Sequence, residues 1–211
     1  MIGIDHTRAG IDVRTVFSFT KKKMAEALAV LQKVPGIEGC VLISTCNRME
    51  LWASTDDGFP EEGLYEQLCK IKEADPGMYR PYFVFRKERE AVQHLFWLAG
   101  GLKSRILGED QIVTQVGEAL SFAREQYATD SVMETLFRMA VTAAKKVKTE
   151  VELSHTDNSV VRTAIDTLKE QGQTFAGKKC MVIGNGVMGK LTATMLLAEG
   201  ADVTVTVRQY R

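Results

Sequence analysis

The first half of the chain alternates short apolar runs with stretches in which apolar residues recur every three or four positions. Apolar or alternating runs of four to six residues are typical of β-strands. Four such runs are Ile2 to Asp5, Cys40 to Thr45, Met49 to Ala53 and Tyr82 to Phe85. Helical spacing predicts a helix that begins after Ser18 or Thr20, either of which can cap it, and runs to about Lys33, and a second helix from about Glu61 to Ala74.

From Glu88 onward the apolar pattern is helical for about sixty residues. Apolar stripes recur at helical spacing in three successive stretches, 91–99, 112–123 and 132–147. The strands before them and the helices after them predict a small α/β unit in which helices pack on a sheet.

A polar stretch, Ser154 to Ser159, separates this unit from a second one and is typical of a linker. After it we expect a helix at 160–168, a strand at 179–183, a glycine-rich turn, a helix to about 199 and a strand at 203–207. The sequence therefore predicts an α/β fold with two domains, residues 1–153 and 154–211. The second domain has the order of an incomplete Rossmann-type unit.

Composition narrows the function classes only a little. The 211 residues carry 27 basic and 27 acidic side chains, so RNA binding would have to rest on a local basic patch, either Lys21 to Lys23 or Lys145, Lys146 and Lys148. Such clusters are more often solvated faces than phosphate contacts. The four cysteines and three histidines lack the spacing of a metal site. No apolar run approaches the roughly 18 residues of a membrane span, and we expect a cytoplasmic protein with reduced thiols.

The glycine-rich turn predicts a dinucleotide site. Gly184-Asn185-Gly186-Val187-Met188-Gly189 follows the strand ending at Ile183 and precedes a helix, the context that a G-x-G-x-x-G fingerprint requires. Gly184 would permit the tight turn, Gly186 the approach of a pyrophosphate, and Gly189 close packing of helix on strand. The alternative is a strand–turn–helix with no ligand.

The end of the last strand favours NADPH over NADH. NAD sites usually place an acidic residue there, which binds the ribose 2′-hydroxyl. This chain instead has Val207-Arg208-Gln209-Tyr210-Arg211, in which Arg208 and Arg211 could pair with a 2′-phosphate. Alternatively, these arginines are solvated.

Cys46 is the candidate nucleophile. It follows an apolar strand and lies in a polar turn beside Arg48, whose guanidinium would favour the thiolate. A thiolate attacks esters to give a thioester, which a hydride can reduce to an aldehyde. The alternative is a small buried residue, which we expect of Cys40 and Cys69.

His94 and the polar residues after Gly101 are further candidates. His94 is either a hydrogen-bonded core histidine or a general acid–base near a thioester. Gln111 and Gln115 share a helix face and, with Ser104, could bind an amino-acid head group. Acidic residues in the same first turn also suit the helix dipole without any ligand.

Two long motifs carry a family resemblance. Ser44-Thr45-Cys46-Asn47-Arg48-Met49-Glu50-Leu51 resembles the STCNRxE signature of glutamyl-tRNA reductases. His94-Leu95-Phe96, Gly101-Leu102-Lys103-Ser104 and Leu107-Gly108-Glu109-Asp110-Gln111-Ile112 resemble the second signature, with Asp110 where proline is common. The resemblance covers essentially the whole chain.

The resemblance implies a role for each matching position. Cys46 would take the glutamyl group from tRNA, His94 would assist acid–base steps, and Arg48 would pair with the glutamate side-chain carboxylate. The implied substrate-binding residues are Thr45, Asn47, Arg48, Ser104, Glu109, Asp110, Gln111 and Gln115. The implied NADPH-binding residues are Gly184, Asn185, Gly186, Val187, Met188, Gly189 and Arg208.

The resemblance also implies a fold, a reaction and partners. The fold would be a ferredoxin-like sheet with added helices, followed by part of a Rossmann domain. The product would be glutamate-1-semialdehyde, the first intermediate of tetrapyrrole and heme biosynthesis, passed to an aminotransferase. Family members continue into a helical dimerisation domain that 211 residues do not include, so we expect a truncated chain. The alternatives are a non-catalytic tRNA- or partner-binding module and an unrelated aldehyde dehydrogenase.

Overall fold

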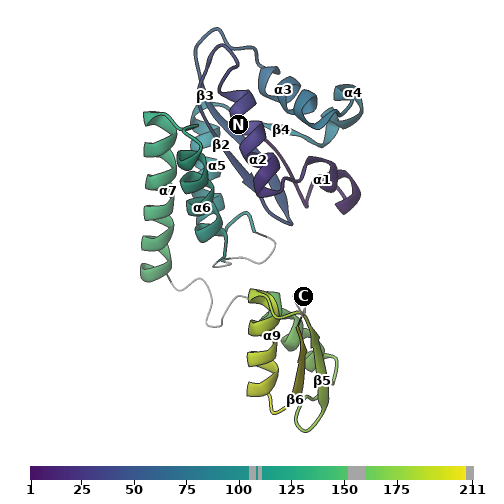
Figure 1. Cartoon of the computed structure of the whole chain (residues 1–211). Coiled ribbons are helices and arrows are strands. Elements are labelled where there is room, and N and C mark those ends of the chain that lie inside the picture. Colours follow the sequence, from purple (N-terminus) through teal and green to yellow (C-terminus); the bar gives the residue numbers. More distant parts are fainter. Residues whose placement is uncertain (105–107, 109–110, 152–159, 208–211) are drawn as a thin grey trace. The chain divides into compact units, whose positions relative to one another are not determined.

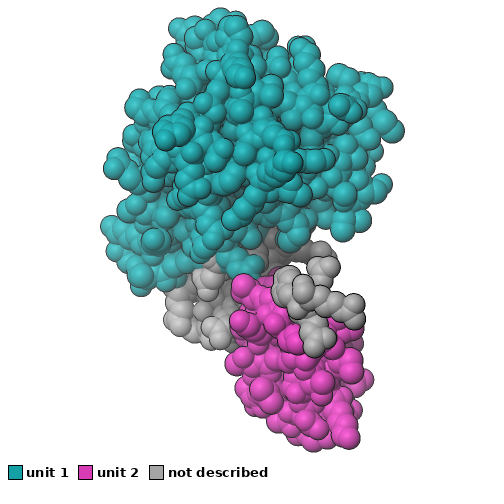
Figure 2. All heavy atoms as spheres, in the orientation of Figure 1, with its two compact units in different colours: residues 1–153 teal, residues 154–211 magenta. Residues whose placement is uncertain are grey.

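The chain forms two compact units, Met1–Leu153 and Ser154–Arg211, which Figure 2 shows in different colours. The computed structural model describes residues 1–104, 108, 111–151 and 160–207. The expected linker at 154–159 therefore lies outside the described residues. Each unit has its own hydrophobic core and is described here by itself.

A four-stranded antiparallel sheet lies at the centre of the first unit (Figure 1). Its strands are β1 (Ile2–Asp5), β2 (Ile37–Ser44), β3 (Arg48–Thr55) and β4 (Val84–Phe85), in the order β2-β3-β1-β4. β2 and β3 form a hairpin in which Leu42 pairs with Leu51 and Ser44 with Met49. The turn of this hairpin leaves Cys46 at one end of the sheet.

Seven α-helices surround this sheet in the described part of the first unit. They are α1 (Ile11–Phe17), α2 (Lys21–Leu31), α3 (Gly63–Lys72), α4 (Pro76–Tyr79), α5 (Glu88–Ala99), α6 (Gln111–Glu125) and α7 (Ser131–Glu150), with a 3-10 turn η1 (Arg80–Tyr82). α2 begins where the Thr20 side chain accepts a hydrogen bond from the backbone N–H of Lys23. α6 packs against the edge strand β2, and Cys40 N–H donates to the Ala128 carbonyl at 2.7 Å. The edge is thereby covered.

Both faces of the sheet are covered. Trp52 of β3 stacks on the ring of His94 from α5 and meets Phe137 of α7 edge-on, so α5 and α7 cover that face. Neighbouring residues of a strand point to opposite faces. Leu51, the neighbour of Trp52, therefore points to the other face, and so do its partner Ile2 and the Phe85 that pairs with Ile2. On that face Phe85 contacts Tyr65 of α3.

The second unit is a parallel strand–helix–strand arrangement with one further helix. It contains α8 (Val160–Glu170), β5 (Lys179–Ile183), α9 (Val187–Ala198) and β6 (Asp202–Thr206). β5 and β6 pair in parallel, with Val182 opposite Val205. Gly200 ends the helix region at φ 82°, a left-handed conformation that glycine adopts without strain.

The expected elements are confirmed within a few residues, and the α/β class holds. The sequence pattern missed α1, because this helix buries only Phe17 and leaves Ile11 exposed, so it has no apolar stripe. Among the residues described, no helix combines the length and apolarity that crossing a bilayer requires.

Candidate active site

The β2–β3 turn presents Cys46 to solvent. Thr45 Oγ1 accepts hydrogen bonds from the backbone N–H groups of Asn47 and Arg48, both at 3.2 Å. The Thr45 N–H donates to the Arg48 carbonyl at 2.8 Å. These three bonds hold the turn closed, and the Cys46 side chain between them is exposed whereas Cys40 and Cys69 are buried, as expected. Burial raises the pKa of the Cys40 thiol to about 12.

A small pocket of about 30 Å³ gathers the turn and the start of α6 around Cys46. It is lined by Thr45, Cys46, Asn47, Arg48, Ser104, Gln111, Ile112 and Gln115. Six of the predicted substrate-binding residues therefore line one pocket with the predicted nucleophile, although Gln115 lies 69 positions after Cys46 in the chain. Glu109 and Asp110, the other two, lie outside the described residues.

A buried polar network lies beside this pocket. Arg48 Nη1 donates to Glu50 Oε1 at 2.8 Å, His94 Nε2 lies 3.0 Å from the same oxygen, and Trp52 Nε1 donates to Glu50 Oε2 at 3.1 Å. Arg48, Glu50 and His94 are 3%, 2% and 4% exposed, so each of these buried polar groups depends on its hydrogen-bond partners. Arg48 Nη2 also donates to the Lys103 carbonyl. The network thus ties the hairpin to the segment that carries Ser104.

The electrostatics of Glu50 follow from this environment. Burial by itself would raise the pKa of its carboxyl group. The hydrogen bond and charge of His94, together with the charge and hydrogen bond of Arg48, outweigh burial and hold this pKa below its usual value. Glu50 is therefore a buried carboxylate that anchors Arg48. Sequence reasoning gave it no role, although an acidic residue within the apolar run Met49 to Ala53 was a usable signal.

His94 is joined to the pocket through two other side chains. Its Nε2 faces Glu50, which holds Arg48, and Arg48 lines the pocket. Its Nδ1 is buried and has no hydrogen-bond partner among the described residues. Arg48, the expected carboxylate partner, and His94, the expected acid–base group, therefore both already form hydrogen bonds inside the protein. Each terminal nitrogen of Arg48 still carries a second N–H group that a ligand can accept from.

The β5–α9 turn contains the three glycines of the predicted dinucleotide fingerprint. Gly184 adopts φ 102°, and a Cβ on Gly189 would lie 2.0 Å from the Gly184 carbonyl oxygen, so both positions require glycine. A Cβ on Gly186 would meet nothing within 4 Å, which leaves open space at the N-cap of α9. Asn185, Val187 and Met188 complete the turn and the first residues of α9, and all three are exposed. Arg208 lies outside the described residues.

Comparison with known proteins gives the family. Residues 2–151 match the family model described as the N-terminal domain of glutamyl-tRNAGlu reductase. The chain belongs to the glutamyl-tRNA reductase family. Glutamyl-tRNA reductases of Acetivibrio thermocellus and Alkaliphilus oremlandii are 45% and 43% identical to it over its whole length. A probable multifunctional siroheme biosynthesis protein of Ruminiclostridium josui is 38% identical over 99% of the chain.

The chain is shorter than these relatives. It spans 62% of the Acetivibrio protein and 63% of the Alkaliphilus protein. Among solved structures, glutamyl-tRNA reductase from Methanopyrus kandleri matches 99% of this chain and 49% of its own, with a TM-score of 0.67 and 27% identity. The likeness therefore extends over both units of this chain.

Proposed function

We propose that this chain carries the acyl-transfer site and the start of the cofactor site of an NADPH-dependent glutamyl-tRNA reductase. The observation that carries the proposal is the exposed Cys46 thiol in a pocket lined by polar side chains. The names of the family model and of the relatives point to the same reaction. Family membership also argues against an unrelated aldehyde dehydrogenase.

The first step is acyl transfer to Cys46. Its thiolate attacks the ester carbonyl of glutamyl-tRNA, a carbon–sulfur bond forms, and the bond to the terminal ribose oxygen breaks. The released ribose oxygen takes up a proton and tRNA leaves. The product is a glutamyl thioester on Cys46, which is reduced to glutamate-1-semialdehyde as the carbon–sulfur bond breaks and the thiolate is restored.

The pocket residues bind and orient the glutamyl group. Arg48, held by Glu50, offers its remaining N–H groups to the side-chain carboxylate. Ser104, Gln111 and Gln115 line the same pocket and supply polar contacts for the amino-acid head group. Thr45 and Asn47 shape the turn that carries the thiol, and Glu109 and Asp110 belong to the same predicted set. His94 positions Glu50 and assists proton transfer.

The second unit would hold the nicotinamide cofactor. NADPH, when bound, supplies the hydride that reduces the thioester. Gly184, Gly186 and Gly189 form the phosphate turn, with open space at Gly186 and the N-terminus of α9 behind it. Asn185, Val187 and Met188 line this turn, and Arg208 would select the 2′-phosphate. The parallel β5–α9–β6 unit supports a Rossmann-type assignment.

The proposal extends to the wider setting of the reaction. The strand order β2-β3-β1-β4 with antiparallel neighbours supports a ferredoxin-like class for the first unit. A tRNA substrate implies a cytoplasmic location and a place at the start of tetrapyrrole and heme biosynthesis. Transfer of the aldehyde to an aminotransferase and homodimer formation rest on the family resemblance alone.

The test is covalent labelling of the intact chain. Glutamyl-tRNA labelled on glutamate is mixed with the protein without NADPH, and the protein is precipitated with acid. We expect label on the wild type and on Cys180→Ser, a matched control in the second unit, and none on Cys46→Ser. Equal labelling of Cys46→Ser would refute Cys46 as the nucleophile. Binding of tRNA without any label would instead favour the non-catalytic module.

A further inference from the structure

A second and larger cavity adjoins the Cys46 pocket in the first unit. It has a volume of about 420 Å³ and lies between α2, β2 and α6. Thr45 and Gln115 line both this cavity and the Cys46 pocket. The two spaces are therefore neighbours, separated by no more than these two side chains. We call the larger cavity the α2–α6 groove.

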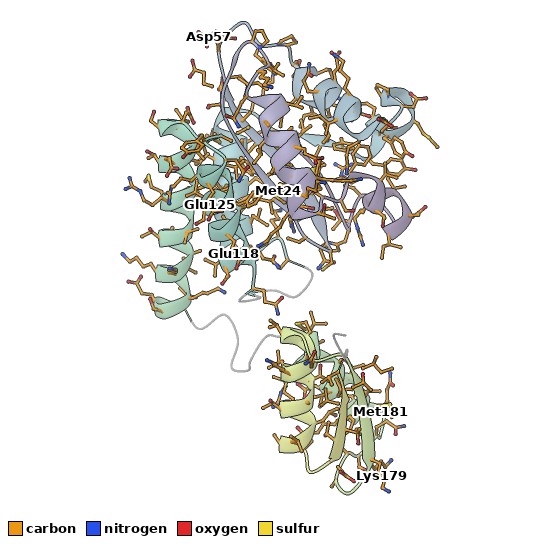
Figure 3. The ribbon with its side chains drawn as sticks, in the orientation of Figure 1. Met24, Asp57, Glu118, Glu125, Lys179 and Met181 are labelled. Carbon is orange, nitrogen blue, oxygen red and sulfur yellow. The ribbon has the colours of Figure 1, made fainter. Side chains whose placement is uncertain are left out.

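The groove leads along α6 toward Cys46. Gln115, Glu118, Phe122 and Glu125 line it at helical spacing, so they share one face of α6. Ten residues of helix span about 15 Å. Gln115, at one end of this face, is the residue shared with the Cys46 pocket. Figure 3 labels Met24 on α2 and Glu118 and Glu125 on α6.

The walls of the groove combine apolar side chains with free carboxylates. Phe19, Met24 and Phe122 are half-buried and offer flat or polarizable surface. Glu118 and Glu125 are exposed and form no ion pair with any described residue. Aromatic side chains stack on nucleobases, and carboxylates accept hydrogen bonds from base amino groups or ribose hydroxyls. This lining suits a nucleoside.

A basic cluster lies where α2 begins, at the rim of the groove. Lys21 lines the groove, Lys22 and Lys23 follow it, and Lys72 lies over the Phe19 ring at 3.9 Å. Burial and then the charge of Lys23 lower the pKa of Lys72. None of these four lysines pairs with a carboxylate among the described residues. Uncompensated lysines beside a nucleoside-sized space suit the phosphates of a nucleic acid.

We propose that the α2–α6 groove binds the 3′-terminal nucleoside of the tRNA that carries the acyl group. The base lies against Phe19, Met24 and Phe122, and the phosphates leave past Lys21 and its neighbours. The inference deepens the proposed function and rests on it, since an acyl group esterified to the terminal ribose brings that nucleoside within one ester bond of Cys46. A groove adjoining the thiol pocket meets this constraint.

The experiment compares the binding of two uncharged tRNAs, one intact and one lacking its 3′-terminal nucleotide. We expect the wild type to lose about tenfold in affinity when the nucleotide is removed, the range that stacking of one base supplies. Phe122→Ala should bind both tRNAs alike, and Phe122→Leu, which keeps apolar volume, should do the same if the first variant is unstable. Phe59→Ala changes a half-buried aromatic residue that lines another cavity and should behave as the wild type.

The lysines are tested by salt dependence. Lys21→Ala should weaken the binding of both tRNAs equally and should reduce the steepness of the plot of log affinity against log salt concentration by about 0.7 to 0.9. Lys33→Ala, an exposed lysine beyond the other end of α2, should leave the slope unchanged. The same slope for Lys21→Ala and the wild type would remove the phosphate half of the proposal.

The outcomes separate this proposal from the proposed function. Equal affinity of the wild type for both tRNAs, or an equal loss in wild type and Phe122→Ala, would overturn the nucleoside site. A terminal-nucleotide effect that depends on Phe122, found together with no label on Cys46, would support the groove while the acyl-transfer proposal fails. Absence of any tRNA binding by the wild type would overturn both.

Discussion

Replacing Glu50 by glutamine tests the buried network beside Cys46. The substitution conserves shape but removes the charge that Arg48 and His94 share. If the amide oxygen takes the place of Oε1, it keeps both of those bonds without charge assistance, and its amino group then faces the Trp52 Nε1–H. A buried donor without an acceptor costs about 1–3 kcal/mol, and each lost charge assistance about 1 kcal/mol. We therefore expect Glu50→Gln to lower the free energy of unfolding by about 3–5 kcal/mol.

Urea unfolding at pH 7, followed by tryptophan fluorescence, measures this loss directly because Trp52 belongs to the network. Glu66→Gln is the matched control. Glu66 is exposed on α3 and pairs with no described cation, so its replacement should change the free energy by less than about 0.5 kcal/mol. In Glu50→Gln, Cys46 should also be acylated more slowly, because Arg48 loses the carboxylate that holds it at the pocket.

The stabilising contribution of Glu50 should decrease as the pH is lowered. The pKa of Glu50 is lowered in the folded protein from a usual value of 4.5. Its stabilising contribution is therefore fully present above pH 4.5 and is lost as the pH falls through the folded pKa. The stability difference between wild type and Glu50→Gln should be largest near neutral pH and shrink below pH 4.5. A loss no greater than that of the control, or a difference that stays constant down to pH 3, would refute the reasoning.

Three further predictions concern the glycine turn and the thiols. Gly189→Ala should destabilise the second unit by about 3 kcal/mol, since its Cβ would lie 2.0 Å from the Gly184 carbonyl oxygen, and amide exchange in residues 179–206 should become faster. The Cβ of Gly186→Ala would meet no such contact, so amide exchange should stay unchanged. The added methyl group should instead weaken NADPH binding, measured by fluorescence titration. Unaltered NADPH binding would contradict a phosphate at that turn. Cys46 should react with a maleimide in the native protein at pH 7, whereas Cys40, which is buried and has its pKa raised to about 12, should react only in urea. Mass spectrometry of the digested protein distinguishes the two thiols. Equal reaction rates in the native protein would contradict the burial of Cys40.

Local features of this chain could be predicted from the sequence because they depend on neighbouring residues. Apolar spacing located the strands and most helices within a few residues, and the strand–glycine–helix order located the glycine turn. Cys46 could be assigned to an exposed turn because the apolar run before it and the alternating run after it required a hairpin connection. These are short-range properties, and the covalent chain itself brings the residues together.

Only the tertiary structure brought distant residues together at the site. Glu50 meets His94 across 44 positions because Glu50 faces α5 and α7 on the sheet, a placement set by strand register and by helix packing. Gln115 and Cys46 line one pocket, and α6 forms the groove with α2, because α6 packs beside the edge strand β2. Periodicity tells which face of a helix is buried but not which strand it covers, since many packings bury the same apolar area. The exposed thiol and the glycine turn were therefore determined by local sequence, whereas the network that holds Arg48 and the groove beside Cys46 were decided by packing.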